Sequence, residues 1–472
     1  MIAVFVIAAC SDDATSPPSH PTDDGGANAS SSSGGVALDS GDESTTVFIG
    51  CCNGVCVDTN TSNEHCGACD SPCNGTEQCT NGSCRVRLGG NGADGAFAPT
   101  ADAVIDNTRS GATGEAGAKV VFTTGIQGFA VGQVVLIHQT RGAGAGKWEL
   151  GNIASIDNGA SSITLARPLA STYTNAGAFD RAQVVKVEQY TSVDIPDGVT
   201  VRAPAWDGNT GGILAFKATG AVNVAGAIAM DGAGFRGPSH AAACAGGTRY
   251  FCTNQDTADG FTGESPFGPS GAGNGANGSG GGGGQDGQDC AAGGGGSYGA
   301  AGAKGTDGAV DGACRAGAQL GGAPGGVVGD ANLDANIVFG GAGGEGGADE
   351  DGAYPGAGGN GGGIIVIAAS SITVAASGSI RANGSGGSDG AVSGACGGAG
   401  CGMGGGGGGA GGAIQLRASG VVDLGDGRVT ATGAGGGVCS CSTAEPGGSG
   451  GAGRIGVSGT TTGTTNPTFA PN

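Results

Sequence analysis

GGILAFKATGAVNVAGAIAMDGAG at residues 211–234 can be laid over two later stretches of the chain, GGIIVIAASSITVAASGSIRANGSG at 362–386 and GGAIQLRASGVVDLGDGRVTATGAG at 411–435. Each stretch begins with two glycines and an alternating apolar run. Two further short apolar runs follow, separated by small residues. Residues 453–457 open like a fourth copy. Three short strands joined by small-residue corners are typical of one coil of a parallel β-helix, which buries its inward face only against neighbouring coils.

The repeat predicts which side chains enter the core. The matching inward positions of the first strand are Phe216, Ile367 and Leu416. Lys217, Ala368 and Arg417 then point outward, because adjacent strand residues alternate between the two faces. We therefore expect an all-β fold: a right-handed parallel β-helix-like solenoid with long glycine-rich excursions, preceded by a small all-β domain and a disulfide-rich module. Unrelated hairpins of similar composition are the alternative.

The composition supports a β-rich chain and excludes several classes of protein. Glycine accounts for 111 of the 472 residues, and charged residues for only 12%. A mainly helical protein is excluded because glycine costs about 1 kcal/mol per helical position relative to alanine. Collagen is excluded because the glycines hold no strict three-residue period. The net charge of −21 repels nucleic acid, so we expect no nucleic-acid partner.

The glycine-rich stretches between the repeats leave two structures open. The longest runs from about residue 232 to residue 361. Ordering glycine costs more backbone entropy than ordering any other residue, so such a stretch is ordered only if its amides are paired. A bundle of extended glycine strands and an unpaired flap are both consistent with the sequence.

The chain divides into five segments by composition. They are a lipoprotein signal segment at 1–9, a disordered tether at 10–47, a cysteine-rich disulfide module at 48–87, a small all-β domain at 88–205 and the glycine-rich β-solenoid at 206–472. The tether has too little apolar surface to fold. The small domain has short apolar runs punctuated by turn residues. Its expected core comprises Phe129, Trp148, Leu150 and Tyr173.

The first ten residues resemble a bacterial lipoprotein signal. MIAVFVIAAC is an apolar run in which small residues directly precede Cys10. The resemblance implies that Cys10 carries the lipid and that the protein is exported. It also implies a membrane partner, with the protein lipid-anchored at the bacterial outer membrane or cell surface.

Seventeen cysteines are consistent with one lipid-bearing residue and two even sets of disulfide candidates. The first set comprises Cys51, Cys52, Cys56, Cys66, Cys69, Cys73, Cys79 and Cys84. The second comprises Cys244, Cys252, Cys290, Cys314, Cys396, Cys401, Cys439 and Cys441. Zinc is the alternative for Cys66 and Cys69, which have ligand spacing beside His65, but export favours disulfides. We therefore expect no metal site and no cofactor.

The first cysteine set lies in a recognisable pattern. GVCVDT, followed by HCGACDSPC and CTNGSC, resembles a cysteine-rich module of myxobacterial surface proteins. Together with the signal segment and the glycine repeat, it makes the chain similar to glycine-rich, cysteine-rich surface lipoproteins of the myxobacterial type. The resemblance implies a surface location and no particular chemistry.

Three motifs suggest catalysis or ligand binding, and each departs from its pattern. RGAGAGKW at 141–148 imitates a phosphate-binding loop, but Arg141 replaces the first glycine and Trp148 the magnesium-binding hydroxyl residue. GGNGADGAF at 89–97 approximates a calcium-binding nonapeptide but is not in tandem. His138 lies in the apolar run VLIHQ, so we expect a buried strand residue rather than a catalytic base.

We expect a non-catalytic, lipid-anchored cell-surface protein with an adhesive or envelope-structural role, and with surface polysaccharide or other cells as partners. An exported carbohydrate-active β-helix enzyme, similar to polysaccharide lyases, is the alternative. It is disfavoured because Arg381, Arg417 and Arg428 fall on the repeat strands without a carboxylate cluster. An ice-binding polyglycine surface is a further alternative, which a flat Thr ladder at the coil spacing would favour.

Substitution of Cys10 by Ala is expected to release the protein from the membrane, because acyl chains supply anchoring at about 0.8 kcal/mol per buried methylene. Radiolabelled palmitate should enter the parent protein and be absent from the Cys10→Ala variant. Label that persists in the variant would contradict the lipid anchor.

Overall fold

The computed structural model describes residues 49–52, 55–62, 64–71, 77–80, 82–86, 88, 90–238, 259–285, 291–308, 320–347, 354–391, 403–439 and 442–471. Every helix or strand assigned within these ranges is a β-strand. They form two units: Met1–Cys73 with Cys79–Cys84, and Arg85–Asn472 with Asn74–Gln78. Cys10 and the predicted tether lie outside the described residues. So do Cys73, Cys244, Cys252, Cys290, Cys314, Cys396, Cys401 and Cys441.

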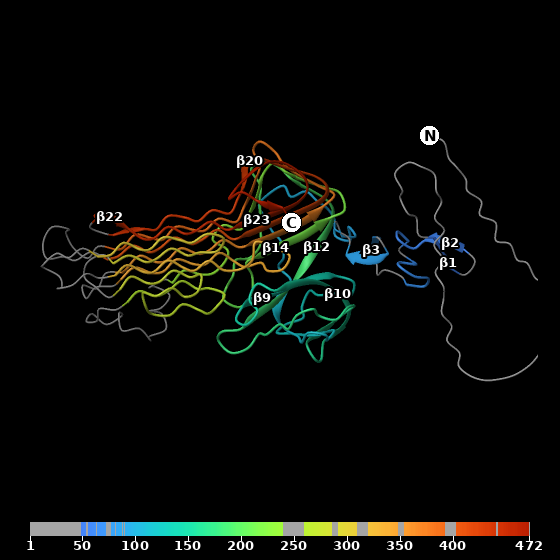
Figure 1. Cartoon of the computed structure of the whole chain (residues 1–472), viewed down its shortest axis with the longest axis horizontal. Helices are drawn as coiled ribbons and strands as arrows, with labels where there is room; N and C mark the ends of the chain where they lie inside the picture. Colours follow the sequence, from blue (N-terminus) through green and yellow to red (C-terminus); the bar gives the residue numbers. More distant parts are fainter. Residues whose placement is uncertain are drawn as a thin grey trace, which may run out of the picture. The chain divides into compact units, whose positions relative to one another are not determined.

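The second unit contains a stack of parallel strands that forms the solenoid (Figure 1). Its first face is built from β14 (Ile213–Ala218), β17 (Ile364–Ala369), the start of β20 (Ala413–Thr430) and the start of β23 (Arg454–Asn466). Each pairs in parallel with the next, so Phe216 lies beside Ile367 and Ile367 beside Leu416. The predicted register of the three repeats is confirmed, and residues 453–457 open a fourth coil of the series.

Two further faces complete each coil. On the second face β15 (Ala221–Val224) pairs with β18 (Ser371–Val374), and on the third β16 (Ala227–Ala229) pairs with β19 (Ser379–Arg381). In the next coil β20 runs through all three faces. The inward side chains of the three faces are mainly aliphatic and are buried, including Leu214, Val222 and Ile228. Burying each one contributes roughly 1.5–3 kcal/mol, so the stacking of coils supplies the core.

The solenoid begins earlier than predicted. β5 (Gly95–Phe97) pairs in parallel with β12 (Arg181–Ile195), and β6 (Ala103–Val104) pairs in parallel with β13 (Thr200–Arg202). β12 and β13 pair in turn with the coil of β14 to β16. The solenoid therefore already includes strands of residues 88–205, the stretch predicted to form a separate small domain. β5 and β6 are too short to show the alternation that reveals the later coils. At the other end, β24 (Ala470–Pro471) pairs with β23.

An antiparallel sheet is inserted between the first two coils. It consists of β7 (Arg109–Thr113), β8 (Val120–Thr123), β9 (Val134–Arg141), β10 (Trp148–Asp157), β11 (Ser162–Leu165) and the first half of β12. β12 belongs to both sheets, since its first half pairs antiparallel with β9 and its second half pairs parallel with β14 and β15. Phe129 and Tyr173 lie in the core of the insert as predicted. Trp148 and Leu150 instead pack between the insert and the solenoid.

The insert covers the outward side of the first solenoid face. Lys217, Ala368 and Arg417 point away from the solenoid core, as predicted, but Lys217 is only 5% exposed. Leu136, Trp148 and Leu150 of the insert share one cavity lining with them. The outward face of these strands is therefore a second buried interface rather than a solvated surface.

His138 on β9 helps to hold a segment of the first glycine-rich excursion. Its Nε2 lies 2.8 Å from the backbone oxygen of Ile337, and its Nδ1 lies 2.9 Å from Oγ1 of Thr140. A carbonyl can only accept, so Nε2 carries the proton and Nδ1 accepts from the Thr140 hydroxyl. Burial lowers the pKa of His138 to about 4. His138 is therefore the buried strand residue that the sequence predicts.

A buried carboxylate ties the same excursion to the rest of the unit. Glu264 is 1% exposed and accepts hydrogen bonds of 3.1 Å from Nε1 of Trp206 and from Nε of Arg236. It also contacts the guanidinium of Arg141 at the end of β9. Since an unpaired buried carboxylate is costly, three donors from separate parts of the chain must assemble around it. The insert, the solenoid and the excursion meet at this one side chain.

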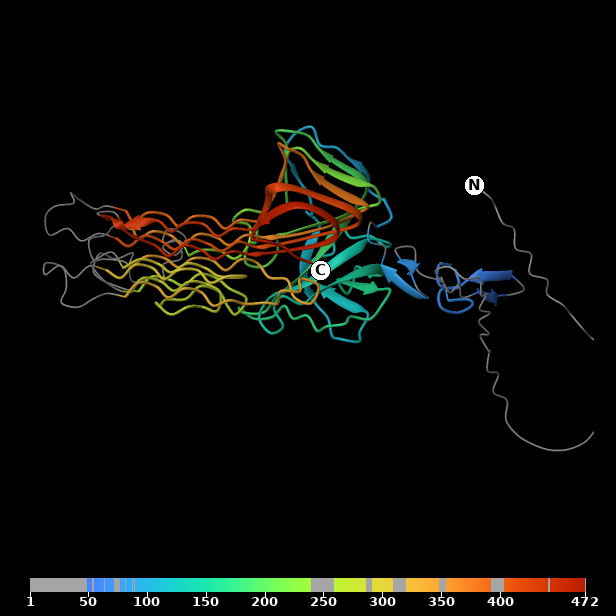
Figure 2. The same ribbon diagram turned by 45° about the horizontal axis from the view of Figure 1, so that its top comes forward.

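The glycine-rich excursions form a bundle of extended strands. They leave the solenoid together and run side by side in both views (Figures 1 and 2). Their backbones are hydrogen-bonded to one another: Gly407 N donates to Gly344 O (2.8 Å), Gly344 N to Gly294 O (2.9 Å) and Gly294 N to Gly282 O (2.8 Å). Of the two structures left open by the sequence, the described residues adopt the paired bundle. Paired amides compensate for the entropy lost in ordering glycine.

Glycine is required in the bundle by close approach of the backbones. A Cβ at Gly407 would lie 2.0 Å from the oxygen of Gly294, and one at Gly344 would lie 1.9 Å from the oxygen of Gly282. These neighbours are backbone atoms from other strands, which cannot rotate away. A side chain at such a position forces the strands apart and breaks the hydrogen bonds around it.

Substitution of Gly407 by Ala is expected to destabilise the protein by about 1–3 kcal/mol or more, as overpacking of a close-packed interior does. Gly435→Ala is the matched control, because a Cβ at this glycine of the next excursion meets nothing within 4 Å. Thermal unfolding of the two variants measures the difference. Equal midpoints for both variants would contradict the packing of the bundle.

The stability of the protein is expected to fall as the pH falls from about 6.5 to about 4. In the unfolded chain His138 has a pKa near its usual value of about 6.5, whereas in the folded protein its pKa is about 4. The folded state therefore binds fewer protons across this window, which lowers its stability by about 3 kcal/mol at the acidic end. Urea unfolding at several pH values, compared with His138→Gln, isolates this effect. A pH dependence that is identical in the variant would contradict it.

Candidate functional site

The cysteine-rich unit is held by disulfides. β1 (Ile49–Cys52) pairs with β2 (Val55–Asp58), and β3 (Glu77–Thr80) pairs with β4 (Ser83–Val86). Cys52 is bonded to Cys69 and Cys66 to Cys79, with Cα–Cα distances of 5.3 and 5.5 Å. Cys51, Cys56 and Cys84 lie on these strands. The predicted disulfide character of this module is confirmed.

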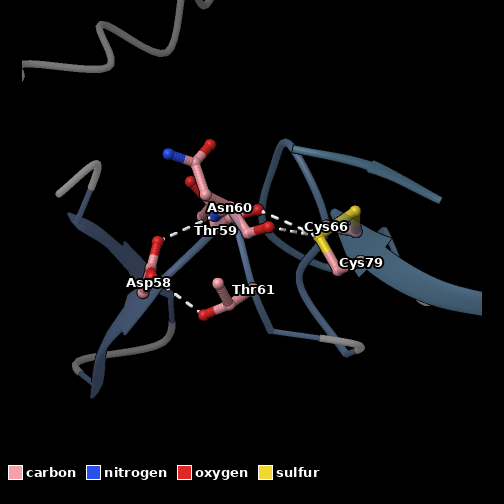
Figure 3. The surroundings of a disulfide bond; sticks show 6 residues. All are labelled: Asp58, Thr59, Asn60, Thr61, Cys66 and Cys79. Atoms are coloured by element: carbon pink, nitrogen blue, oxygen red, sulfur yellow. Dashed lines mark hydrogen bonds between the residues drawn. A yellow bond between two sulfur atoms is a disulfide. The ribbon is translucent and has the colours of Figure 1, made fainter. Parts of the chain in front are cut away.

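A tight turn beside the Cys66–Cys79 bridge fixes the local backbone (Figure 3). Asp58 accepts hydrogen bonds from the backbone N of Asn60 (2.9 Å) and from Oγ1 of Thr61 (2.8 Å). The turn brings the carbonyl oxygens of Thr59 and Asn60 to 3.3 and 3.2 Å from Sγ of Cys79. Such Asp-led turns compensate for the missing hydrophobic core by ordering the chain between bridges.

The zinc alternative for Cys66 and Cys69 is wrong because both cysteines are disulfide-bonded. Cys66 and Cys69 are each part of a separate disulfide and present no thiolate. Nδ1 of the adjacent His65 accepts a hydrogen bond of 3.1 Å from the backbone N of Asp70. Within the described part of the chain no group of three or more His, Cys, Asp or Glu side chains is arranged to hold a metal ion. In the second set, Cys439 is disulfide-bonded.

The motifs that imitate catalytic sites have structural roles. Residues 142–147 form the turn between β9 and β10, which pair antiparallel, whereas a phosphate-binding loop leads into a helix. Asp94 of the nonapeptide-like stretch accepts a hydrogen bond from the backbone N of Gln189 (2.7 Å) and lies 3.1 Å from Nζ of Lys186. His138 has both ring nitrogens engaged.

The three arginines of the repeat strands are also engaged. Arg381 pairs with Asp231 at 2.9 Å, Arg417 contacts Asp334, and Arg428 contacts the backbone oxygen of Ala376. Each thus stabilises its own surroundings, and the structure brings no two of them to one carboxylate.

A groove of about 550 Å³ lies in the second unit. We call it the aromatic groove. Its lining residues come from four segments: the turn after β9, the two residues that precede β12, and two parts of the first excursion. They are Gly142, Ala143, Gly144, Ala145, Phe179, Asp180, Pro266, Phe267, Val328, Gly329, Asn336 and Val338.

Two exposed phenylalanines dominate the aromatic groove. Phe179 is 60% and Phe267 is 64% exposed, which is unusual for side chains of this size. A Cβ at Gly268 would lie 3.5 Å from the ring of Phe179, and one at Gly278 would lie 2.1 Å from the ring of Phe267. Both rings therefore rest on glycine backbone. Glycine supplies flat supports that keep the outer ring faces open.

Polar groups line the same groove. Asp180 accepts a hydrogen bond of 3.3 Å from the backbone N of Ala143. Nδ2 of Asn336 donates to the backbone oxygen of Ala145 at 3.0 Å, while its Oδ1 is buried without a hydrogen bond from any described residue. The groove thus combines apolar ring faces with a carboxylate and an acceptor amide oxygen. A small number of polar groups on an apolar concave surface is typical of a ligand site.

The supports of the aromatic groove are fixed. Arg141 donates from Nε to the backbone oxygen of Phe179 (2.9 Å), and Gly142 N donates to the backbone oxygen of Pro266 (2.8 Å). Arg141 also contacts Glu264, so the carboxylate that joins the parts of the unit lies directly behind the groove. The sequence gives little sign of this site because its aromatic residues are isolated in the chain. Their only sequence signal is a Phe beside turn residues.

Comparisons with known proteins bear on the cysteine-rich unit. Residues 40–87 match the Stigma-specific STIG1-like protein family. No curated protein matches the chain. Among the described residues, no helix is long and apolar enough to cross a membrane.

One solved structure shows a distant local likeness. The tailspike protein gp49 from Pseudomonas phage LKA1 is 13% identical over 25% of this chain and 24% of its own, with a TM-score of 0.14. The match thus spans about a quarter of the tailspike chain, and a score this low carries no argument. The chain is similar to the STIG1-like family over its cysteine-rich module alone.

Proposed function

We propose that this chain is a non-catalytic, lipid-anchored adhesin of the bacterial cell surface, and that the aromatic groove binds surface polysaccharide. The observation that carries the proposal is the pair of exposed rings, Phe179 and Phe267, in a groove of about 550 Å³. Exposed large apolar side chains gathered in a hollow mark an interaction site.

The chemistry of the groove suits a sugar chain. The apolar C–H faces of a pyranose pack against aromatic rings, and its hydroxyl groups both donate and accept hydrogen bonds. Asp180 and the Oδ1 atom of Asn336 offer acceptors for these hydroxyls. An open groove, unlike a closed pocket, also lets a polymer pass through on both sides.

The backbone on both sides of the aromatic groove is held rigidly, which favours ligand binding by the groove. The backbones on both sides of the groove are joined by the Gly142–Pro266 hydrogen bond and by the Arg141–Glu264 contact. A site that is ordered before binding loses little conformational entropy when the ligand arrives.

The location rests on the N-terminal part of the chain. The lipoprotein-like signal with Cys10, the tether and the disulfide module together suit a myxobacterial-type surface lipoprotein in the outer membrane. Disulfides persist in exported proteins and are rare in the cytosol, which agrees with this location.

The two alternatives have weaker support. An enzyme of the lyase type requires a base beside an acidic cluster, whereas Arg381 and Arg417 each pair with one carboxylate and Arg428 contacts a backbone oxygen. An ice-binding face requires a uniform ladder. The outward column of the second solenoid face instead mixes side-chain types, in the order Asp194, Asn223, Thr373, Asp423 and Thr462.

Removal of both groove rings tests the proposal. The double variant Phe179→Ala with Phe267→Ala is expected to weaken binding of isolated surface polysaccharide by at least roughly tenfold, because each ring contributes buried apolar area. Phe122→Ala is the matched control, since Phe122 on β8 is 55% exposed and does not line the groove. Equal binding by the double variant and the control would overturn the groove assignment.

The same samples test the absence of catalysis. The length distribution of the polysaccharide should be unchanged after prolonged incubation with the protein. Shortened chains would support the enzyme alternative and contradict the non-catalytic role.

A further inference from the structure

A second candidate site lies on the covered side of the first solenoid face. Lys217, Ala368 and Arg417 are direct neighbours in the parallel ladder of β14, β17 and β20. Neighbouring strands are roughly 4.8 Å apart, so the two cations stand two strands apart. The small side chain of Ala368 between them leaves space above the middle strand.

This space is a cavity of about 80 Å³. Its walls are mainly apolar and include Leu136, Trp148 and Val366. Its polar lining consists of Lys217, Gln415 and Arg417. A single water molecule needs roughly 10–15 Å³ of such space, so the cavity has room for a small polyatomic ion.

The charge in the cavity is predominantly positive. Lys217 is 5% exposed, and burial together with the nearby Arg417 charge lowers its pKa to about 8. Burial also lowers the pKa of Arg417. Asp334 contacts Arg417, but it is 46% exposed and is not part of the cavity lining. The buried Lys217 and the partly buried Arg417, which is 27% exposed, thus face one apolar-walled space, an arrangement that favours an anion.

The side-chain oxygen of Gln415 needs a hydrogen-bond donor from the ligand. Its side chain is fully buried, and its Nε2 contacts Asp334. Its Oε1 is buried and receives no hydrogen bond from the described residues. A buried amide oxygen without a donor costs free energy, so a ligand with an O–H group gains by supplying one.

We infer that this cavity binds bicarbonate, held between Lys217 and Arg417 with its hydroxyl donating to Oε1 of Gln415. Bicarbonate is small, planar and singly charged, and it carries both anionic oxygens and one O–H donor. Nitrate has the same charge and a similar shape and size, but it has no donor. The ammonium of Lys217 has three N–H donors, so a bond to another group leaves donors for the anion. The binding is independent of the proposed adhesive function.

Titration calorimetry of the whole protein with sodium bicarbonate and sodium nitrate, at constant ionic strength and about pH 7.5, tests the inference. Bicarbonate should bind the parent protein, and nitrate should bind roughly tenfold more weakly, the effect of one hydrogen bond to a buried acceptor. Gln415→Met should remove this preference. Lys217→Met should abolish binding of both anions, whereas Lys119→Met, at an exposed lysine of the insert, should leave it unchanged.

A second variant keeps the test decisive if Lys217→Met does not fold. Ala368→Leu retains both cations but fills the space between them, so bicarbonate binding should be lost. Unchanged binding by this variant, or equal binding of the two anions by the parent, would overturn the site. A ¹³C spectrum with labelled bicarbonate separates the bound ion from a carbamate on a lysine nitrogen, and a carbamate signal would overturn the non-covalent site.

Discussion

The close approach of glycine backbones is the constraint on which the second unit depends. At Gly344 and Gly407 the missing Cβ would lie about 2 Å from the carbonyl oxygen of another strand. No other residue type fits at that distance. The bundle is therefore held mainly by backbone hydrogen bonds, and most hydrophobic burial is left to the solenoid and the insert.

The solenoid sets the register of the bundle. Each excursion leaves after the third face of one coil and returns to the first face of the next. The ladder continues into the roots of the excursions, where Gly362 N donates to Ala410 O (2.8 Å) and Gly411 N donates to Gly451 O (3.0 Å). Strands that begin in register at the solenoid remain paired as they run outward. The aliphatic core of the coils thereby organises a structure that has almost no side chains of its own.

The solenoid register was predictable from the sequence, and the two candidate sites were not. Alternating apolar residues after each Gly-Gly pair set the alignment of Phe216, Ile367 and Leu416, because only one register buries all of them. Both sites depend on the insert, which packs over the outward side of the first solenoid face. The alternation within the repeats alone predicts that this side is exposed to solvent. Lys217 is instead buried because the insert covers it. The aromatic groove combines Phe179 with Phe267, and their proximity depends on the buried Glu264 network rather than on any local pattern.

Interlocking of the excursions restricts how the bundle can change in evolution. Gly344, in the first excursion, accepts from Gly407 in the second, and Gly408 donates to Gly448 in the third at 2.9 Å. An insertion into one excursion alone would extend a strand beyond its partners and leave its amides unpaired. The bundle can therefore gain or lose length only through matched insertions or deletions in several excursions. Distant parts of the gene must then vary together.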